Sequence, residues 1–404
     1  MNGRRAALTE PAAVLAALLA AVLVAGCGTI SPAATWRPQA SDENPGSPLP
    51  ARTETAVPVT AVPATTEACE LPPVRARAAQ LLLVGIPGTA ADEAALELVR
   101  EGVGGVVLLG SNVETADQVA SLVLGLQAEA PIPLAVAIDE EPGRIGRLAK
   151  AAIIAGSPSA RSLGKRTARQ VEATGRRIGS ALADLGITVD LAPVLDVTGA
   201  AAGGVIGDRA FGSSPAVVSR AGVAFLAGLT KAGVAGVGKH FPGHGETTTD
   251  SHTDLPLVSA SRRTLERRAL PPFEAAIEAG IPAIMVGHLL VPALDATRPA
   301  SLSKKVIGGL LRDDLGFDGV VMADDLNMGA LDRYGELPER TELAIRAGVD
   351  LAIVLDHRAV PDVIERLVES VEAGRLPESR LDEAFLRVAR FKGLDDWAGC
   401  DSGG

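Results

Sequence analysis

The sequence predicts an α/β protein that folds as a single (β/α)8 TIM-type barrel, with no second domain after it. From about residue 74 onward, eight short runs of apolar and β-branched residues alternate with longer segments of helical periodicity. Apolar strands that alternate with helices indicate a parallel sheet covered on both faces, and eight such units suit a closed barrel. Titratable residues directly follow several runs, where a barrel carries its functional groups. A doubly wound open sheet is the structural alternative.

The predicted strands are Gln80–Gly85, Gly104–Leu109, Pro133–Ile138, Thr188–Ala192, Gly233–Lys239, Ala283–Gly287, Gly319–Ala323 and Asp350–Leu355. Helical patterns cover Ala91–Glu101, Thr115–Ala128, Ala168–Leu185, Ala216–Ala232, Arg262–Ala279, Ser303–Asp314, Val360–Glu372 and Pro377–Phe391. These elements place the barrel domain at about residues 71–396, followed by a short tail at 397–404.

Four polar residues stand directly after predicted strands. Asp139 follows the third strand, His240 the fifth, His288 the sixth and Asp324 the seventh. In a (β/α)8 barrel the carboxyl ends of all strands meet at one rim, which carries the active site. These four side chains are therefore expected at that rim.

The first 26 residues are typical of a bacterial lipoprotein signal. Arg4 and Arg5 precede an apolar stretch, Ala12–Ala25, which is too short to favour a spanning helix. Small residues then lead directly into Cys27, so we expect cleavage before Cys27 and a lipid on its thiol. The protein is expected to be exported and lipid-anchored to the outer face of the cell membrane. An ordinary signal peptide with an incidental cysteine, or a retained membrane anchor, are the alternatives.

Residues 27–70 are rich in Pro, Ala and Thr and lack apolar periodicity, which predicts a flexible tether between the lipidated cysteine and the barrel. Cys69 and Cys400 flank the patterned region, one at each end. Outside the cytoplasm these two residues could form a disulfide that joins the ends of the domain. Two unpaired thiols remain equally compatible with the sequence.

The net charge of −11 argues against nucleic-acid binding, which needs clustered basic side chains to contact phosphates. Aromatic residues make up only 2% of the chain, so an extended platform for stacking sugar rings is not expected.

The segment Lys239–His252 contains three of the five histidines of the chain in a loop marked by glycine and proline. Imidazole can give and take a proton near neutral pH. An aspartate two residues before a histidine can fix its tautomer and stabilise its charged form, so we pair Asp250 with His252 as a proton-transfer dyad. Two alternatives stay open: a metal site using His240 and His244 with the dyad, and a structural loop with solvated histidines.

A second motif, Gly319–Met328, delivers two adjacent carboxylates to the end of an apolar strand. Side chains alternate along a strand, so only one of Asp324 and Asp325 should face the site. The other should point aside or cap the next helix, and helix capping is also the structural alternative for the pair.

Two further motifs place charged residues in glycine-containing loops, at Ile138–Arg147 and at Gly207–Gly212. Carboxylates and guanidinium groups can bind sugar hydroxyls through directional hydrogen bonds. Taken singly, each motif is better explained as an Asp–Arg ion pair that braces its loop.

Together these motifs resemble the family 3 glycoside hydrolases, specifically their β-N-acetylhexosaminidase branch, over about residues 75–395. The most specific part is Lys-His-Phe-Pro-Gly-His-Gly followed by Asp-Ser-His, here Lys239–Gly245 and Asp250–His252. The resemblance implies that Asp324 is the catalytic nucleophile, His252 the general acid/base and Asp250 its partner. The residues implied to hold the terminal sugar are Asp139, Arg147, Arg209, Lys239 and His240.

The motif at Ile138–Arg147 departs from the pattern Asp-Gln-Glu-Gly-Gly-Arg that is frequent in the family. Glu140 and Pro142 stand where that pattern has glutamine and glycine. These residues could stiffen the loop or alter what lies beside the sugar.

Many family 3 β-glucosidases take a catalytic glutamate from a following domain. A chain that ends with its barrel would need a proton donor from the barrel, which agrees with His252.

The resemblance and the predicted export imply an exo-acting, retaining β-N-acetylglucosaminidase that removes terminal N-acetylglucosamine from peptidoglycan fragments through a covalent glycosyl-enzyme. Two alternatives remain. One is a phosphorylase that uses the same site but releases sugar 1-phosphate, and the other is a surface sugar-binding lipoprotein without turnover. We expect no cofactor, no metal, no nucleic-acid partner and a monomeric protein.

Overall fold

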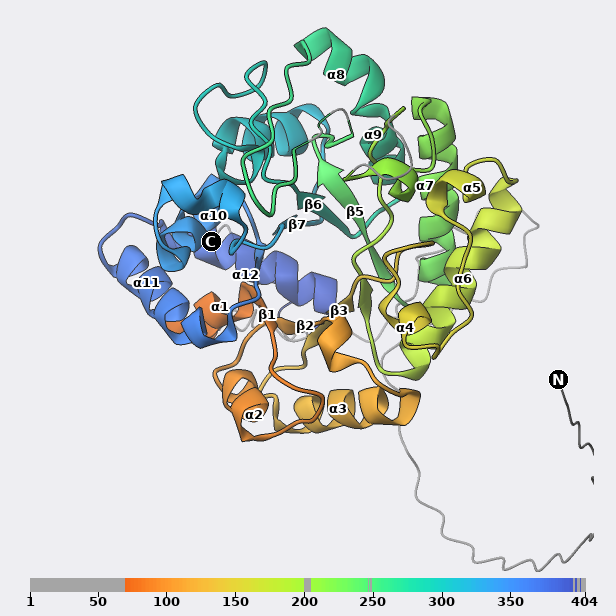
Figure 1. Cartoon of the computed structure of the whole chain (residues 1–404). Coiled ribbons are helices and arrows are strands. Elements are labelled where there is room, and N and C mark those ends of the chain that lie inside the picture. Colours follow the sequence, from red (N-terminus) through yellow and green to blue (C-terminus); the bar gives the residue numbers. More distant parts are fainter. Residues whose placement is uncertain are drawn as a thin grey trace, which may run out of the picture. The chain divides into compact units, whose positions relative to one another are not determined.

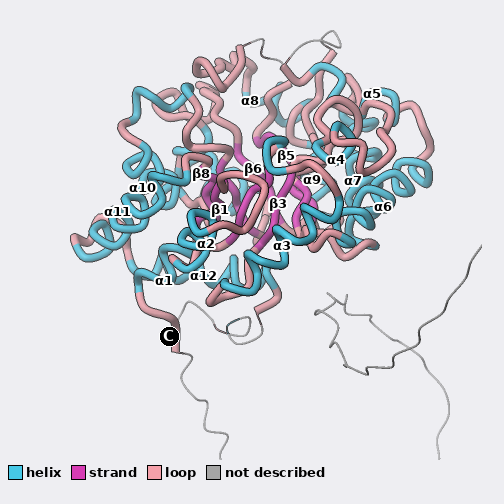
Figure 2. Tube along the Cα trace, turned by 60° about the horizontal axis from the view of Figure 1, so that its bottom comes forward, coloured by secondary structure: helices cyan, strands magenta, loops and turns pink. Residues whose placement is uncertain are grey.

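The protein is a closed barrel of eight parallel strands, in the order β1 to β8, and this confirms the predicted fold class. The computed structural model describes residues 70–199, 205–245, 247, 249–394, 397 and 400. Figure 1 shows the strands at the centre of a ring of helices, and Figure 2 shows the same arrangement with strands in magenta and helices in cyan. Among the described helices, none is both long and apolar enough to cross a membrane.

Every predicted strand is present. The strands are β1 Leu82–Gly85, β2 Gly105–Leu108, β3 Ala135–Ile138, β4 Val189–Asp190, β5 Ala235–Phe241, β6 Ala283–Val286, β7 Val320–Ala323 and β8 Leu351–Val354. The strand β5 runs two residues further than predicted, so His240, which was predicted to follow the strand, lies within it beside Lys239. Their side chains are therefore fixed by the sheet itself.

The helices are α1 Val74–Gln80, α2 Glu93–Arg100, α3 Ala116–Glu129, α4 Arg147–Lys150, α5 Ala160–Leu163, α6 Ala168–Asp184, α7 Pro215–Lys231, α8 Arg262–Arg268, α9 Pro271–Glu278, the π-helix η4 Lys305–Asp314, α10 Leu337–Ala347, α11 Val360–Glu372 and α12 Glu378–Lys392. Short 3-10 turns complete the chain at η1 Gly110–Asn112, η2 Gly207–Arg209, η3 Ala300–Leu302, η5 Gly329–Tyr334 and η6 His357–Ala359.

The single helix predicted at Arg262–Ala279 is wrong, because two helices occupy this range. The helix α8 ends at Arg268, and α9 begins at Pro271 with a second proline after it. A proline has no N–H to donate to the preceding turn, but it is well tolerated at the first position of a helix. The two prolines therefore end one helix and start the next.

The apolar core has two layers, which follow from the alternation of side chains along each strand. Leu83 and Val107 point into the barrel, where they pack with residues such as Met285 and Ile353. Neighbouring residues such as Leu82 point outward and pack against the helices. Both faces of the sheet are thus buried, as the unbroken apolar strands predict.

The helix α12 closes the base of the barrel, the end where the strands begin. Val388 is buried against the inward-facing residues of the strands, and Figure 1 shows α12 crossing the centre of the ring. Asp350, directly before β8, is fully buried and pairs with Arg312 at 2.5 Å and with Arg380 of α12 at 2.7 Å. The base is therefore sealed by packing and by buried ion pairs, and the opposite rim is left for chemistry.

Candidate active site

A cavity of about 280 Å³ opens at the carboxyl ends of the strands. All the predicted catalytic and sugar-binding residues line it. They are Asp139, Arg147, Arg209, Lys239, His240, Asp250, His252 and Asp324. The fold thus brings together residues that are up to 185 positions apart in the sequence (324 − 139), at the rim where barrels carry their active sites.

A cluster of alternating charges forms one wall of the cavity. The Nζ of Lys239 lies 2.6 Å from Asp139 and 2.9 Å from Glu141, and Arg209 binds both carboxylate oxygens of Glu141, at 2.8 and 2.9 Å. Arg147 lies 3.4 Å from Asp139, and its Nε is buried with no partner among the described residues. These side chains hold one another in place and still present Asp139, Arg147 and Lys239 to a ligand.

Glu141 is the buried centre of this cluster. Burial would raise the pKa of Glu141, but the charges of Lys239 and Arg209, which also hydrogen-bond to it, lower the pKa well below its ordinary value. In this motif the family resemblance implied sugar binding for Asp139 and Arg147 only, and nothing in the sequence assigned Glu141 its role as the common partner of two cations.

The ion pair between Glu141 and its two cations is expected to stabilise the fold in a pH-dependent way. A carboxyl group whose pKa is lowered on folding contributes stability above its unfolded pKa of about 4.3, and this contribution is lost as the pH falls through the folded pKa. Glu141→Gln should therefore lower the free energy of unfolding at pH 7 by about 3–5 kcal/mol, because it leaves buried cations unpaired. Denaturant unfolding at several pH values should show this difference shrinking below a pH of about 4.

Asp208→Asn is the matched control, because Asp208 pairs with the more exposed Arg144 at 2.9 Å. That substitution should change the free energy of unfolding by less than about 1 kcal/mol at any pH. Equal stability of Glu141→Gln and the parent protein at pH 7 would contradict the assignment.

The Arg144–Asp208 pair also joins the two charged loops, since one residue comes from each motif. The structural alternative, an Asp–Arg ion pair that braces the loops, is thus correct for Arg144 and Asp208. Glu140, one of the departures from the family pattern, points away from the charge cluster. Its carboxylate accepts the backbone N–H groups of Leu148 at 2.8 Å and Ala149 at 3.3 Å, and so fixes the start of α4.

Asp196 organises the Lys239–His252 segment, and no local motif in the sequence indicates it. Its side chain is fully buried, one oxygen lies 2.8 Å from Nδ1 of His240, and the other accepts the backbone N–H of His244 at 2.6 Å. Burial would raise the pKa of Asp196, but His240 and His244 lower it, so the group is an anion. One carboxylate therefore fixes both histidines.

The predicted dyad is formed. One oxygen of Asp250 lies 2.7 Å from Nδ1 of His252 and also accepts its backbone N–H at 3.0 Å. These bonds lower the pKa of Asp250, chiefly through the backbone N–H of His252. The side chains of His252 and Asp250 are 69% and 48% exposed, which places the dyad at the mouth of the cavity.

The loop that carries His252 is held against the loop that follows β7. The N–H groups of Gly329 and Ala330 donate to the carbonyl groups of His252 and Ser251, at 3.3 and 3.2 Å. A side chain on Gly329 would lie 3.0 Å from the carbonyl oxygen of His252, so glycine allows this close approach. The proton-transfer loop and the Asp324 loop are thus in direct backbone contact.

Asp324 lies directly after β7 and lines the cavity. Asp325 also borders the cavity, contrary to the prediction that it points aside, but one of its oxygens is held by backbone N–H groups. Asp325 accepts the backbone N–H groups of Asn327 at 3.2 Å and Leu355 at 3.1 Å, and burial raises its pKa to about 6. Burial would likewise raise the pKa of Asp324, but His240, the N–H of Asp325 and Lys239 help to lower it. An ionised Asp324 is the form that can act as a nucleophile.

His288 is at the rim as predicted, but it supports the site from behind. It is fully buried, with Nδ1 2.8 Å from the hydroxyl of Ser301 and Nε2 2.9 Å from the carbonyl oxygen of Asp325. The described residues contain no group of three His, Cys, Asp or Glu side chains placed to hold a metal ion. The Nδ1 atoms of His240, His244 and His252 instead contact three different side chains, those of Asp196, Thr247 and Asp250.

The cysteine predictions fall largely outside the described residues, since Cys27 and Cys69 both lie there. Cys400 is buried and disulfide-bonded. Its pairing with Cys69 stays a prediction.

Comparison with known proteins identifies the family. The sequence model described as "Glycosyl hydrolase family 3 N terminal domain" matches residues 73–391. The chain belongs to glycoside hydrolase family 3. It is 40% identical over 402 residues to the beta-hexosaminidase LpqI of Mycobacterium tuberculosis, which covers 96% of this chain and 98% of that relative. The beta-hexosaminidase of Alkalilimnicola ehrlichii is 35% identical, over 78% of this chain and 90% of the relative.

Among solved structures, a glycoside hydrolase family 3 beta-N-acetylglucosaminidase from Paenibacillus sp. superposes with a TM-score of 0.77 at 35% identity. The superposition covers 82% of this chain and 64% of that longer chain. These relatives confirm that the present family 3 member is a glycoside hydrolase of the β-N-acetylhexosaminidase type, which hydrolyses β-N-acetylglucosaminides. The alternative of a sugar-binding protein without turnover is thereby set aside.

Proposed function

We propose that this family 3 β-N-acetylhexosaminidase is a retaining exo-enzyme that removes terminal N-acetylglucosamine from peptidoglycan fragments of the N-acetylglucosamine–N-acetylmuramic acid type. The observation that carries the proposal is the convergence of Asp324, the Asp250–His252 dyad and the Lys239 charge cluster on one cavity. A cavity of about 280 Å³ suits one terminal sugar better than an internal stretch of polysaccharide.

The residues that line the cavity include both groups that a double displacement needs, a nucleophile and an acid/base. Asp324, ionised inside the cavity, attacks the anomeric carbon and forms a covalent glycosyl-enzyme, while the protonated His252 gives its proton to the departing oxygen. The now neutral His252 takes a proton from water, and the resulting hydroxide-like oxygen attacks the anomeric carbon and releases Asp324. Asp250 holds the imidazole ring and stabilises its charged form during the first step.

The stereochemistry and the acceptor test this function together. With a defined N-acetylglucosaminyl–N-acetylmuramic acid disaccharide, early proton NMR spectra should show free N-acetylglucosamine as the β-anomer. Adding inorganic phosphate should leave the products unchanged. Initial release of the α-anomer would overturn retention, and accumulation of sugar 1-phosphate would instead identify a phosphorylase.

The proposed location rests on the N-terminal sequence. In this proposal residues 1–26 are removed as a signal peptide, Cys27 carries lipid, residues 27–70 form the tether, and the enzyme acts at the outer face of the cell membrane. Cys27→Ala should abolish incorporation of a labelled fatty acid into the protein and leave residues 1–26 attached, with its activity in detergent extracts unchanged. Equal labelling of the variant and the parent protein would contradict lipid anchoring at Cys27.

A further inference from the structure

Besides Nε of Arg147, a second buried side-chain nitrogen in the cavity has no hydrogen-bond partner among the described residues. His244 lines the cavity, its side chain is almost completely buried, and its Nε2 has no hydrogen-bond partner among the described residues. Buried polar groups in folded proteins are nearly always paired, so an unpaired one in a ligand cavity points to the ligand.

The ring of His244 is held in place on its other sides. Its Nδ1 lies 2.8 Å from the hydroxyl of Thr247, and its backbone N–H donates to Asp196. Its ring packs edge-on against that of His240, with 5.8 Å between the ring centres. These contacts orient the free nitrogen and leave it little freedom to find a partner elsewhere.

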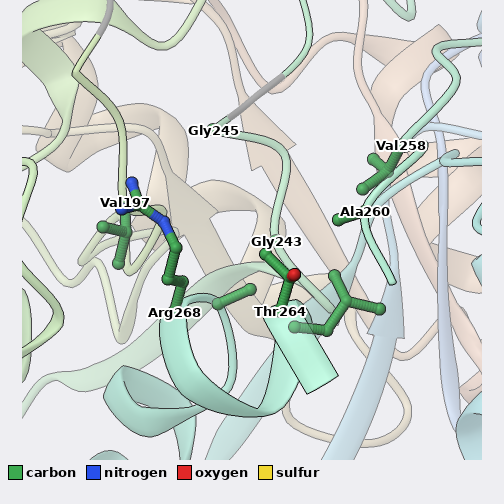
Figure 3. A pocket seen from close by; sticks show the side chains of 9 residues that line it. Val197, Gly243, Gly245, Val258, Ala260, Thr264 and Arg268 are labelled. Atoms are coloured by element: carbon green, nitrogen blue, oxygen red, sulfur yellow. The ribbon is translucent and has the colours of Figure 1, made fainter. Parts of the chain in front are cut away.

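The backbone on both sides of His244 is equally constrained. Gly243 has a φ of +126°, which disfavours any other residue, and a side chain on Gly245 would lie 2.4 Å from the carbonyl oxygen of Val197. Figure 3 shows these two glycines beside a second, mainly apolar cavity of about 20 Å³, which His244 does not line. The loop therefore turns its apolar side to this space and His244 to the main cavity.

His244 lines the same cavity as Asp324 and Asp250. The charge of Asp324 acts on the pKa of His244, and His244 in turn acts on the pKa of Asp250. Burial and the neighbouring His240 lower the pKa of His244, which favours a neutral ring. In the proposed mechanism Asp324 contacts the anomeric carbon, and the substituent on the next carbon of an N-acetylhexosamine is the 2-acetamido group.

We propose that Nε2 of His244 hydrogen-bonds the 2-acetamido group of the bound sugar, which makes His244 a residue that determines specificity for N-acetylated substrates. An amide offers both a donor and an acceptor, so it can pair with either tautomer of a neutral imidazole. The inference deepens the proposed function, because it takes from it the position of the anomeric carbon beside Asp324.

The test compares two substrates that differ only at this position, a 4-nitrophenyl β-N-acetylglucosaminide and the corresponding β-glucoside. In His244→Ala, kcat/KM for the N-acetylglucosaminide should fall by about 10- to 100-fold, as expected for the loss of one buried hydrogen bond. The value of kcat/KM for the glucoside should change much less, so the ratio of kcat/KM for the N-acetylglucosaminide to kcat/KM for the glucoside should fall. The Kd of the product N-acetylglucosamine should rise as well, and this can be measured by calorimetry without turnover.

Two variants separate binding from folding. His244→Gln can place a polar group close to the position of Nε2 and should recover part of the preference. Val258→Ala, which removes packing from the apolar cavity behind the loop, should leave the preference unchanged even if it lowers the melting temperature. An equal fall of kcat/KM on both substrates, or an unchanged Kd in a folded His244→Ala, would overturn the proposal. A failure of the proposed function would appear in the parent enzyme itself, as the wrong anomer or product.

Discussion

Asp324→Asn is expected to abolish hydrolysis of aryl N-acetylglucosaminides and to leave the barrel folded. The substitution removes the negative charge that attacks the anomeric carbon, and loss of a covalent nucleophile costs on the order of 10⁴-fold or more in kcat. The side-chain oxygen that accepts the N–H of Asp325 at 2.9 Å is retained by asparagine, so the local structure has no reason to change. Steady-state kinetics and the melting temperature, measured on the same preparation, check both parts.

The neighbouring carboxylate provides the matched control for this prediction. Asp325 uses its side chain to hold backbone N–H groups, so Asp325→Asn should lose far less activity than Asp324→Asn and should act mainly on stability. Full activity in Asp324→Asn, or an equal loss in both variants, would remove Asp324 from the role of nucleophile.

His252→Ala should lower activity in a way that depends on the leaving group. General acid catalysis contributes about 10²- to 10⁴-fold, and it matters most when the departing oxygen is strongly basic. The variant should therefore lose about that much on the natural disaccharide, and much less on a dinitrophenyl glycoside, whose leaving group needs no proton. Because His252 is largely exposed, its removal should leave the melting temperature nearly unchanged.

A plot of log kcat/KM against the pKa of the leaving group makes this prediction quantitative. The slope should be steeper for His252→Ala than for the parent enzyme, and Asp250→Asn should lie between the two because it keeps a partner for Nδ1 but loses its charge. A loss that is the same for every leaving group would mean that His252 acts by some means other than proton transfer.

Much of the fold was predictable because a parallel barrel leaves a strong pattern in the sequence. Its strands are buried on both faces, so they appear as continuous apolar runs, and the ends of those runs indicate the rim. Boundaries were less predictable: the helical periodicity of Arg262–Ala279 continues through the break at Pro271, and β5 extends to Phe241 because sheet pairing with β6 persists there. The local signal for the first boundary, the two prolines, was outweighed by the periodicity around it, whereas the end of β5 was decided by a tertiary contact that the local sequence does not contain.

The site residues were predictable where a chemically reactive side chain also stands at a recognisable place in the sequence, such as the end of a strand or a short motif. Asp324 ends an apolar strand, and Asp250 and His252 are two residues apart in a loop rich in histidine. Asp196 had no such signal, because it stands in an irregular stretch after β4 and its partners lie more than 40 residues away. A residue whose function is to fix others at long range becomes visible only when the chain is folded.

The N-terminal end of the described chain lies at the closed base of the barrel. The described chain begins at Glu70, beside α1, and the indole of Trp397, just beyond α12, donates to the carbonyl oxygen of Glu70 at 3.4 Å. Arg77 of α1 binds Glu378 of α12 at 2.6 Å, so the start of the domain is fastened to the same helix that seals the base. In the proposed lipid-anchored form, the tether would therefore join the domain on the side away from the mouth of the cavity and would leave the entrance of the site uncovered.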